Sequence, residues 1–155
     1  MNDHTASAES APPETFDPLQ LDLQLCFTLY AAGHLVTRLY RPLLEPLGLT
    51  YPQYLAMLAL WERAPQTMGE LSRRLRLDSG TLAPLFNRLE ARGLVTRTRD
   101  AQDERRVQVG LTPAGAALRE AAVDVPRQAF CQLPLPADDL VRLKADLQRL
   151  VDSLS

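Results

Sequence analysis

Cysteine is scarce in this chain, with only Cys26 and Cys131 among 155 residues. Two cysteines that lie 105 positions apart do not make the disulfide framework of a small secreted protein, so any disulfide is expected to be transient. No apolar run reaches the roughly eighteen residues that a membrane-spanning helix needs, and no basic segment followed by an apolar one resembles a secretory signal. The expected protein is cytoplasmic and has no membrane contact.

A strong net charge is also lacking, since the whole chain carries only −2, which taken alone argues against nucleic acid as a partner. The charge is unevenly distributed, however. Residues 63–106 hold ten arginines and six acidic residues, a net charge of +4, whereas residues 1–62 carry −5 and residues 107–155 carry −1. The positive charge is therefore concentrated in one segment, where it can contact phosphates.

That basic segment has the pattern of a winged helix-turn-helix. Thr67 and Glu70 form a capping box that predicts a helix from Met68. Asp78 or Ser79 can cap a second helix, whose apolar face is made by four residues: Leu82, Leu85, Phe86 and Leu89. Residues 94–96 and 107–109 have strand character on either side of the polar tip 100–106. The expected fold class is mainly α with a small β wing, and residues 65–112 form the DNA-binding unit.

Long amphipathic helices are expected on both sides of this unit. An apolar stripe runs from Leu19 until Pro42 and Pro46, and a capping box of Thr50 and Gln53 starts another helix, with Leu55, Leu58 and Trp61 on its buried face. Residues 137–154 carry a further stripe at nearly heptad spacing. The helices of 19–64 and 113–155 are therefore expected to form the dimerisation and sensor region of a single domain, 19–155, while residues 1–18 have the composition of a disordered tail.

The second helix of the unit presents polar side chains to the major groove. We expect DNA contacts from its first turns and from the strand that follows, at five positions: Ser79, Thr81, Pro84, Arg88 and Arg97. A two-fold homodimer would place two such helices on successive major grooves of a pseudo-palindromic operator. A helical hairpin that only packs is the alternative, but it leaves the highly charged loop unexplained.

The spacing from Asp78 to Val95 and the run DERRVQVGLTPAG from Asp103 resemble the MarR family of dimeric bacterial repressors, from about residue 20 to the C-terminus. The resemblance implies that Asp103 orients Arg105, that Arg105 enters the minor groove, and that Arg106 contacts phosphate or packs. Asn87 and Ala83 depart from residues common in the family, which leaves the operator sequence open.

The string from Leu25 to Glu62 resembles one branch of that family, the organic-hydroperoxide-sensing repressors. The resemblance implies that Cys26 is the peroxide-sensing cysteine, that the hydroxyls of Tyr40 and Tyr51 hydrogen-bond its sulfur, and that Tyr30 is a third aromatic nearby. Phenolic O–H donors stabilise a thiolate, and so does the start of a helix. In two-cysteine members, a cysteine placed like Cys131 resolves the sulfenic acid as a disulfide with the partner subunit.

Each of these residues also has a structural alternative. On composition alone, Cys26 is better explained as a small buried apolar residue. Cys131 can be an inert thiol, and each tyrosine can be a core residue with a satisfied hydroxyl. The apolar residues near the site favour a lipid-like or aromatic hydroperoxide over hydrogen peroxide; they are Phe27, Leu29, Tyr54 and Trp61.

The predicted function is a redox-sensing repressor that releases its operator when an organic hydroperoxide oxidises Cys26. The alternative is a repressor of the same family that is controlled by a reversibly bound aromatic or carboxylic ligand, with Cys26 structural. A thiol peroxidase is disfavoured because no arginine stands beside Cys26 in the sequence to bind a peroxide. We therefore expect no enzyme activity, catalytic residue, metal or cofactor.

Overall fold

The computed structural model describes residues 17–99, 103 and 106–154. The predicted tail, residues 1–18, lies outside the described residues except for its last two positions. The chain divides into two compact units, Met1–Leu35 and Val36–Ser155. None of the described helices is long and apolar enough to cross a membrane.

The described part of the first unit is helical. A 3-10 turn, η1 (Leu21–Leu23), comes before helix α1 (Leu25–Leu44), which begins in this unit and ends in the second. The predicted start at Leu19 was wrong because Gln24 is extended and separates the two helices. The large apolar side chains of this unit are exposed to solvent, at Leu21, Leu23, Leu25, Phe27, Tyr30 and Leu35.

The second unit holds the remaining elements. The predicted end of the first long helix at Pro42 and Pro46 is confirmed, since α1 ends at Leu44, with Pro42 inside its last turn and Pro46 in the short turn that follows. The elements after α1 are η2 (Glu45–Leu47), α2 (Tyr51–Glu62), β1 (Gln66–Thr67), α3 (Met68–Leu75), α4 (Ser79–Ala91), β2 (Val95–Arg99), β3 (Val107–Leu111), α5 (Pro113–Ala122), α6 (Val125–Cys131) and α7 (Ala137–Ser153).

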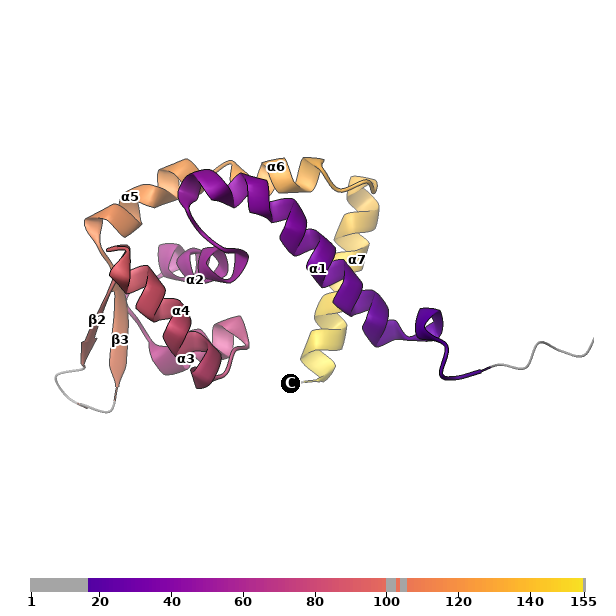
Figure 1. The fold of residues 1–155 in the computed structure, drawn as a ribbon, viewed down its shortest axis with the longest axis horizontal. Coiled ribbons are helices and arrows are strands. Elements are labelled where there is room, and N and C mark those ends of the chain that lie inside the picture. The colour runs from indigo at the N-terminus through magenta and orange to yellow at the C-terminus, as the bar shows by residue number, and fades with distance from the viewer. Residues whose placement is uncertain (1–16, 100–102, 104–105, 155) are drawn as a thin grey trace, which may run out of the picture. The chain divides into compact units, whose positions relative to one another are not determined.

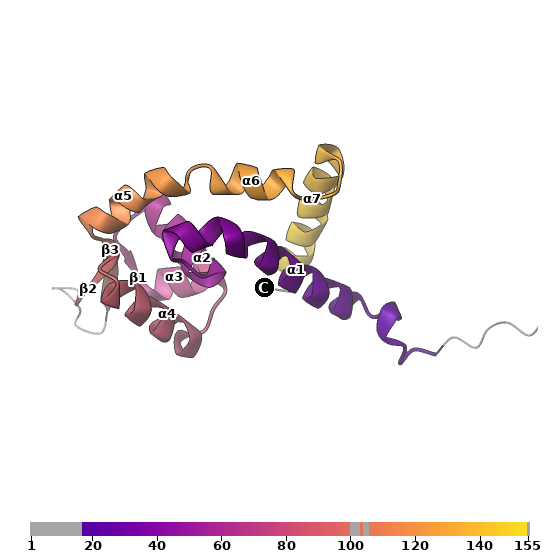
Figure 2. The same ribbon diagram turned by 45° about the horizontal axis from the view of Figure 1, so that its top comes forward.

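Helix α2 is the centre of the core of this unit. The predicted capping box is present, with the Thr50 hydroxyl accepting from the backbone of Gln53 and the Gln53 side chain accepting from the backbone of Thr50. The helix packs against α3, α4 and α5 (Figure 2). Its most buried residues are Gln53, Tyr54, Ala56, Met57, Ala59 and Leu60. Leu55, Leu58 and Trp61, which were predicted to form the buried face, are only partly buried. Other side chains of the helix are the most buried, since α3, α4 and α5 all pack against it.

A three-stranded antiparallel sheet in the order β1-β3-β2 forms the wing and its base. Val95 pairs with Leu111 and Arg99 pairs with Val107, so β2 and β3 form a hairpin that lies beside α4 (Figure 1). Strand β1 was not expected, since strand character was predicted only at residues 94–96 and 107–109. Two residues carry no alternating pattern, so only their pairing with β3 reveals them as a strand.

The C-terminal helices leave much apolar surface uncovered. Thr112 caps α5 by accepting the backbone N–H of Gly115. Pro126 lies in the first turn of α6. Helix α7 has no buried residue, and its exposed apolar side chains include Val141, Leu143 and Leu147. An apolar stripe of this kind is typical of a helix that packs against a further surface.

Candidate nucleic-acid interface and sensor site

Helix α4 has one exposed face that could enter a groove of DNA. The Asp78 carboxylate caps it by accepting the backbone N–H of Thr81 at 2.9 Å, and these bonds hold the pKa of Asp78 below its usual range. Thr81, Pro84 and Arg88 are exposed and lie three and four positions apart, on the side opposite the buried Leu82, Phe86 and Leu89. Ser79 is the exposed first residue of the helix. The four predicted contacts of this helix are thus on its accessible surface.

Two of these residues differ in detail from the sequence interpretation. The Thr81 hydroxyl donates to Asp78 at 3.0 Å, so in this geometry its oxygen is left as an acceptor and its proton is engaged. Pro84 had been expected near the helix start, but it lies past the first turn, where the missing N–H removes a bond to the carbonyl of Gly80. The guanidinium of Arg88 makes no bond to the described residues and can meet a phosphate.

Arg97 has a local partner that the sequence did not reveal. Its guanidinium donates to the Glu90 carboxylate at 2.6 and 2.9 Å, and its backbone N–H donates to the same carboxylate at 3.1 Å. The arginine holds the pKa of Glu90 below its usual range. This pair ties the first strand of the wing to the last turn of α4. A phosphate contact by Arg97 stays a prediction, and it would have to compete with Glu90.

In the loop at the tip of the wing, the structure describes Asp103 and Arg106 but not Arg105. The backbone N–H of Arg106 donates to the carbonyl of Asp103 at 2.8 Å, and the two side chains approach to 3.9 Å. The predicted contact between Asp103 and Arg105 lies outside the described residues. Arg106 and Arg73 of α3 line one cavity of about 480 Å³, which places two cations at the junction of wing and helix. Arg73 was missed because nothing in the sequence brings it near the wing.

Three tyrosines meet at the junction of α1 and α2 in the second unit, and we call Tyr40, Tyr51 and Tyr54 the tyrosine cluster. The ring centres of Tyr40 and Tyr51 are 4.8 Å apart, and Tyr54 lies 5.9 Å from Tyr40 and 6.5 Å from Tyr51. Burial raises the pKa of each hydroxyl, that of Tyr54 to about 12. All three phenols therefore stay protonated near neutral pH and can act as hydrogen-bond donors.

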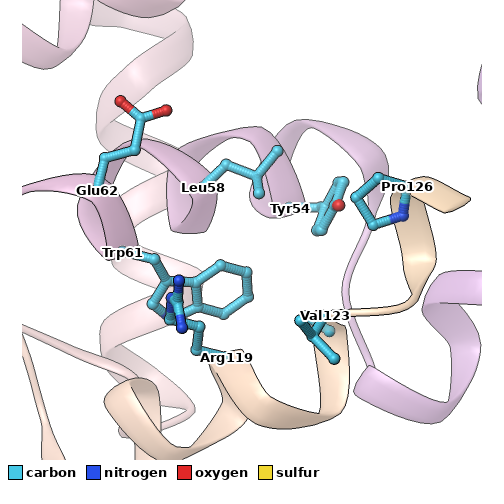
Figure 3. Close-up of a pocket in the computed structure, with 8 residues that line it drawn as sticks. Tyr54, Leu58, Trp61, Glu62, Arg119, Val123 and Pro126 are labelled. Atoms are coloured by element: carbon cyan, nitrogen blue, oxygen red, sulfur yellow. The ribbon is translucent and has the colours of Figure 1, made fainter.

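Tyr54 also lines a second cavity, of about 210 Å³, together with Trp61, Arg119 and Val123 (Figure 3). Its ring contacts that of Trp61 edge to face at 6.4 Å, and the indole N–H of Trp61 donates to the carbonyl of Gly115 at 2.8 Å. The Tyr54 hydroxyl is buried and has no hydrogen-bond partner among the described residues. The sequence analysis had assigned Tyr54 and Trp61 to an apolar lining and had not considered the buried hydroxyl of Tyr54.

The two cysteines are free and exposed. Cys26 is the second residue of α1, so it lies in the first turn as predicted, and it belongs to the first unit. Cys131 is the last residue of α6, in the second unit. The alternative of a buried apolar thiol does not fit the exposure of either cysteine. Tyr30 is also exposed and packs on His34 at a ring distance of 4.3 Å, in the first unit. The pairing of Cys26 with Tyr40 and Tyr51 stays a prediction.

A buried polar joint links α2 to the DNA-binding unit, and we call it the α2 joint. The Gln66 side chain, 1% exposed, donates to the carbonyls of Ala59 at 2.7 Å and Arg63 at 2.5 Å. Arg74 of α3 donates to the same Ala59 carbonyl at 3.1 Å, to the Gln66 side chain at 3.2 Å, and to Glu62. The Ala59 carbonyl also accepts the backbone N–H of Arg63 at 3.4 Å, so these donors add to that bond and give the Arg63 carbonyl a partner. Helix α2 thus carries the tyrosine cluster near its start and is fastened to α3 at its end.

Comparison with known proteins agrees with this architecture. The sequence profile of the MarR family matches residues 49–107. The organic hydroperoxide resistance transcriptional regulator of Bacillus subtilis (strain 168) is 46% identical over 139 residues, which cover 90% of this chain and 95% of that protein. Solved structures of AbfR, a protein of Staphylococcus epidermidis, are also similar to this chain.

Reduced AbfR bound to DNA shares 36% sequence identity with a TM-score of 0.73, covering 86% of this chain and 94% of that one. AbfR with its disulfide formed shares 37% identity with a TM-score of 0.61, covering 84% and 92%. The winged helix is thereby confirmed as the fold class, and the named relatives are transcriptional regulators rather than enzymes. The chain therefore belongs to the MarR family of transcriptional regulators, with an organic hydroperoxide resistance regulator among its near relatives.

Proposed function

We propose that this regulator is a homodimeric repressor that senses organic hydroperoxides through Cys26 and releases its operator when Cys26 is oxidised. The observation that carries the proposal is the tyrosine cluster, in which the two tyrosines expected beside the sensing sulfur lie 4.8 Å apart. Both keep their protons, because burial raises the pKa of each. The relative from Bacillus subtilis, which is named for organic hydroperoxide resistance, supports the same assignment.

The chemistry follows from the groups present. The Cys26 thiolate attacks the terminal oxygen of the peroxide, so that an S–O bond forms, the O–O bond breaks and the alkoxide leaves as an alcohol after it takes a proton. Sulfur loses two electrons, which the peroxide gains. Phenol donors from Tyr40 and Tyr51 would stabilise the thiolate and raise the fraction of reactive sulfur.

The resulting sulfenic acid is proposed to condense with Cys131 of the partner subunit, releasing water and forming a disulfide. The exposure of Cys131 at the end of α6 supports this role, and so does a relative for which a disulfide-bonded form is known. A disulfide requires Cα atoms within about 7 Å of one another. Forming it would constrain α6 of one subunit against α1 of the other and so displace the helices between sensor and wing.

In the reduced state, the dimer is proposed to hold the α4 helices in two successive major grooves, with the wings on the flanking backbone. The exposed apolar stripe of α7 and the exposed apolar residues of the first unit supply surface for the subunit contact. DNA contacts come from the exposed face of α4 and from the wing, at Ser79, Thr81, Pro84, Arg88, Arg97, Asp103, Arg105 and Arg106. Like the operator itself, these assignments are proposals.

The decisive experiment measures operator affinity by fluorescence anisotropy, on a site selected from a random DNA pool by the reduced protein. Wild type, Cys26→Ser and Cys131→Ser are each titrated before and after one equivalent of cumene hydroperoxide. Release by wild type that dithiothreitol reverses, and that Cys26→Ser abolishes, is the expected result. Cys131→Ser should release DNA without running as a disulfide-linked dimer on a non-reducing gel. Retention of DNA by oxidised wild type would refute the redox switch.

One observation favours a second function for the same fold. The cavity beside Tyr54 has mostly apolar walls with two charged residues, Arg119 and Glu62, and the apolar walls with the Arg119 cation suit a small aromatic acid (Figure 3). A regulator of this type would release DNA on adding such an acid under reducing conditions, and Cys26→Ser would respond as wild type does. The same anisotropy assay with benzoate and hydroxybenzoates separates the two functions.

A further inference from the structure

One arginine joins the end of helix α4 to the turn between α1 and α2. Arg92 is the residue that caps α4 at its C-terminus. Its guanidinium donates to the carbonyl of Leu47 at 3.1 Å and to the carbonyl of Gly48, which lie 45 and 44 positions away in the sequence. In the described chain, no backbone N–H of a turn or a helix cap donates to either carbonyl. We call this contact the Arg92 clasp.

Glycine at position 48 leaves room for the clasp. Gly48 has a φ of 62°, in the left-handed region, and a Cβ added there would stand 2.6 Å from a guanidinium nitrogen of Arg92. The turn is held firmly, because Leu47 and Leu49 on either side of Gly48 are each 6% exposed and belong to the core. The guanidinium therefore binds carbonyls whose positions are fixed by packed side chains.

The clasp connects the helix expected to read DNA with the end of a helix expected at the subunit contact. Leu47 and Gly48 follow α1, which ends at Leu44 and carries exposed apolar residues such as Phe27 for the proposed dimer. Apolar packing has little directional preference, so packed helices can slide over one another by small amounts. Hydrogen bonds to two fixed carbonyls oppose such a movement of α4, because they depend on distance and angle.

We infer that Arg92 is a positioning residue that determines which spacing of operator half-sites the dimer accepts. The inference rests on the proposed homodimer on DNA and adds a determinant of its specificity. Two recognition helices related by a two-fold axis have to meet two half-sites, and one base pair changes the separation of these by about 3.4 Å and their relative rotation by about 35°. A clasped α4 cannot follow that change, whereas an α4 without the clasp can tilt toward a displaced half-site. Arg92 itself reads no base, since it lies at the opposite end of α4 from Ser79.

The test uses the operator selected by the reduced protein and two altered operators, with one base pair added or removed between the half-sites. Fluorescence anisotropy gives the affinity for each, and the ratio of the affinity for the selected spacing to that for an altered spacing is the readout. Wild type should bind the altered operators at least about tenfold more weakly, because the DNA has to be deformed to fit. Arg92→Gln should bring the ratio to about threefold or less, and its affinity for the selected operator should fall by about two- to tenfold because α4 is no longer preorganised.

Gly48→Asn tests the clasp without removing a charge. Asparagine tolerates a positive φ, and its Cβ would push the guanidinium of Arg92 away from the turn, so the ratio should narrow as it does in Arg92→Gln. Arg127→Gln removes an exposed arginine of α6, paired with Asp124 at 3.4 Å, and should keep the wild-type ratio. A variant that is only less stable, or that has only lost a charge, binds all three operators more weakly by the same factor and leaves the ratio unchanged.

Two results would overturn the role of Arg92 while the proposed repressor stands. One is a wild type that binds all three spacings equally, and the other is a wild-type ratio that persists in Arg92→Gln or in Gly48→Asn. If wild type selects no operator, or binds DNA as a monomer in analytical ultracentrifugation, the proposed dimeric repressor is refuted, and the role of Arg92 with it. A narrowed ratio in both variants and not in Arg127→Gln supports the clasp.

Discussion

The α2 joint allows the effect of one substitution, Gln66→Leu, to be worked out. The side chain of Gln66 is 1% exposed and makes three hydrogen bonds, two as donor and one as acceptor from Arg74. Leucine has a similar volume but removes all three bonds. Arg74 continues to serve the Ala59 carbonyl, so the carbonyl of Arg63 and one N–H of Arg74 are the groups left without these partners.

The expected loss follows from those groups. A net hydrogen bond contributes about 0.5–1.5 kcal/mol, and leaving a buried partner unsatisfied costs about 1–3 kcal/mol. Burying an apolar side chain in place of the amide offsets part of this, on the order of 1 kcal/mol. The free energy of unfolding should therefore fall by about 2–4 kcal/mol. With a denaturation slope of about 1–3 kcal/mol per molar urea, the midpoint should fall by about 1 M or more.

Urea unfolding of the reduced protein, followed by circular dichroism at one fixed protomer concentration, measures this change. Concentration must be fixed because subunit association contributes to apparent stability. Gln128→Leu makes the same chemical change at an exposed position of α6 and should shift stability by less than about 0.5 kcal/mol. Equal midpoints for Gln66→Leu and Gln128→Leu would refute the joint as a stabilising contact.

Three further predictions follow from particular contacts. Gly115→Ala should lower stability by about 1–3 kcal/mol in urea unfolding, because an added Cβ would stand 1.9 Å from the backbone oxygen of Leu94, while Gly69→Ala, with its nearest atom at 3.8 Å, should not. Tyr54→Phe should leave stability unchanged or raise it by up to about 3 kcal/mol, since it removes a buried hydroxyl without a partner. Because burial raises the pKa of Tyr54 to about 12, wild type binds that proton more strongly when folded, so its stability should fall as pH rises above 10, and the variant should lose less. Glu90→Gln should show the opposite dependence of stability on pH. Arg97 lowers the pKa of Glu90, so wild type should be more stable than the variant in thermal unfolding at pH 7. This difference in stability should disappear as acid protonates the carboxylate in the folded protein.

The features that the sequence predicted well are those encoded within a few residues. The capping boxes of Thr50 with Gln53 and Thr67 with Glu70, and the cap at Asp78, were confirmed at the helix starts where they were expected. Each depends on a side chain that bonds the backbone three residues away, so the local sequence contains both partners. Gly93, which follows α4, has a φ of 69°, a conformation that glycine adopts readily at a helix end. The wing hairpin was also confirmed, because its two strands follow one another in the sequence and pair with each other.

Features that depend on distant partners could not be predicted in this way. Arg97 was assigned to phosphate because a sequence shows its charge but not the Glu90 carboxylate that occupies it. Gln66 was not singled out from the sequence, although it is among the most buried polar side chains of the described chain. From its charge alone, Arg92 is expected to be solvated, and only the folded chain shows the carbonyls of Leu47 and Gly48 that its guanidinium binds.

Helix α2 explains how a chemical change at the sensor can reach DNA in the proposed mechanism. It is 12 residues long, about 18 Å, and has Tyr51 as its first residue. A helix of this length, surrounded by packed side chains, moves as one body because bending it would break hydrogen bonds and open voids. At its other end the α2 joint fixes the carbonyl of Ala59, in the last turn, and that of Arg63, the residue after the helix, to β1 and α3, the elements that support α4. In the proposed mechanism, a displacement that begins at the tyrosine cluster therefore moves the DNA-binding unit. The Glu90–Arg97 pair makes the wing move together with α4.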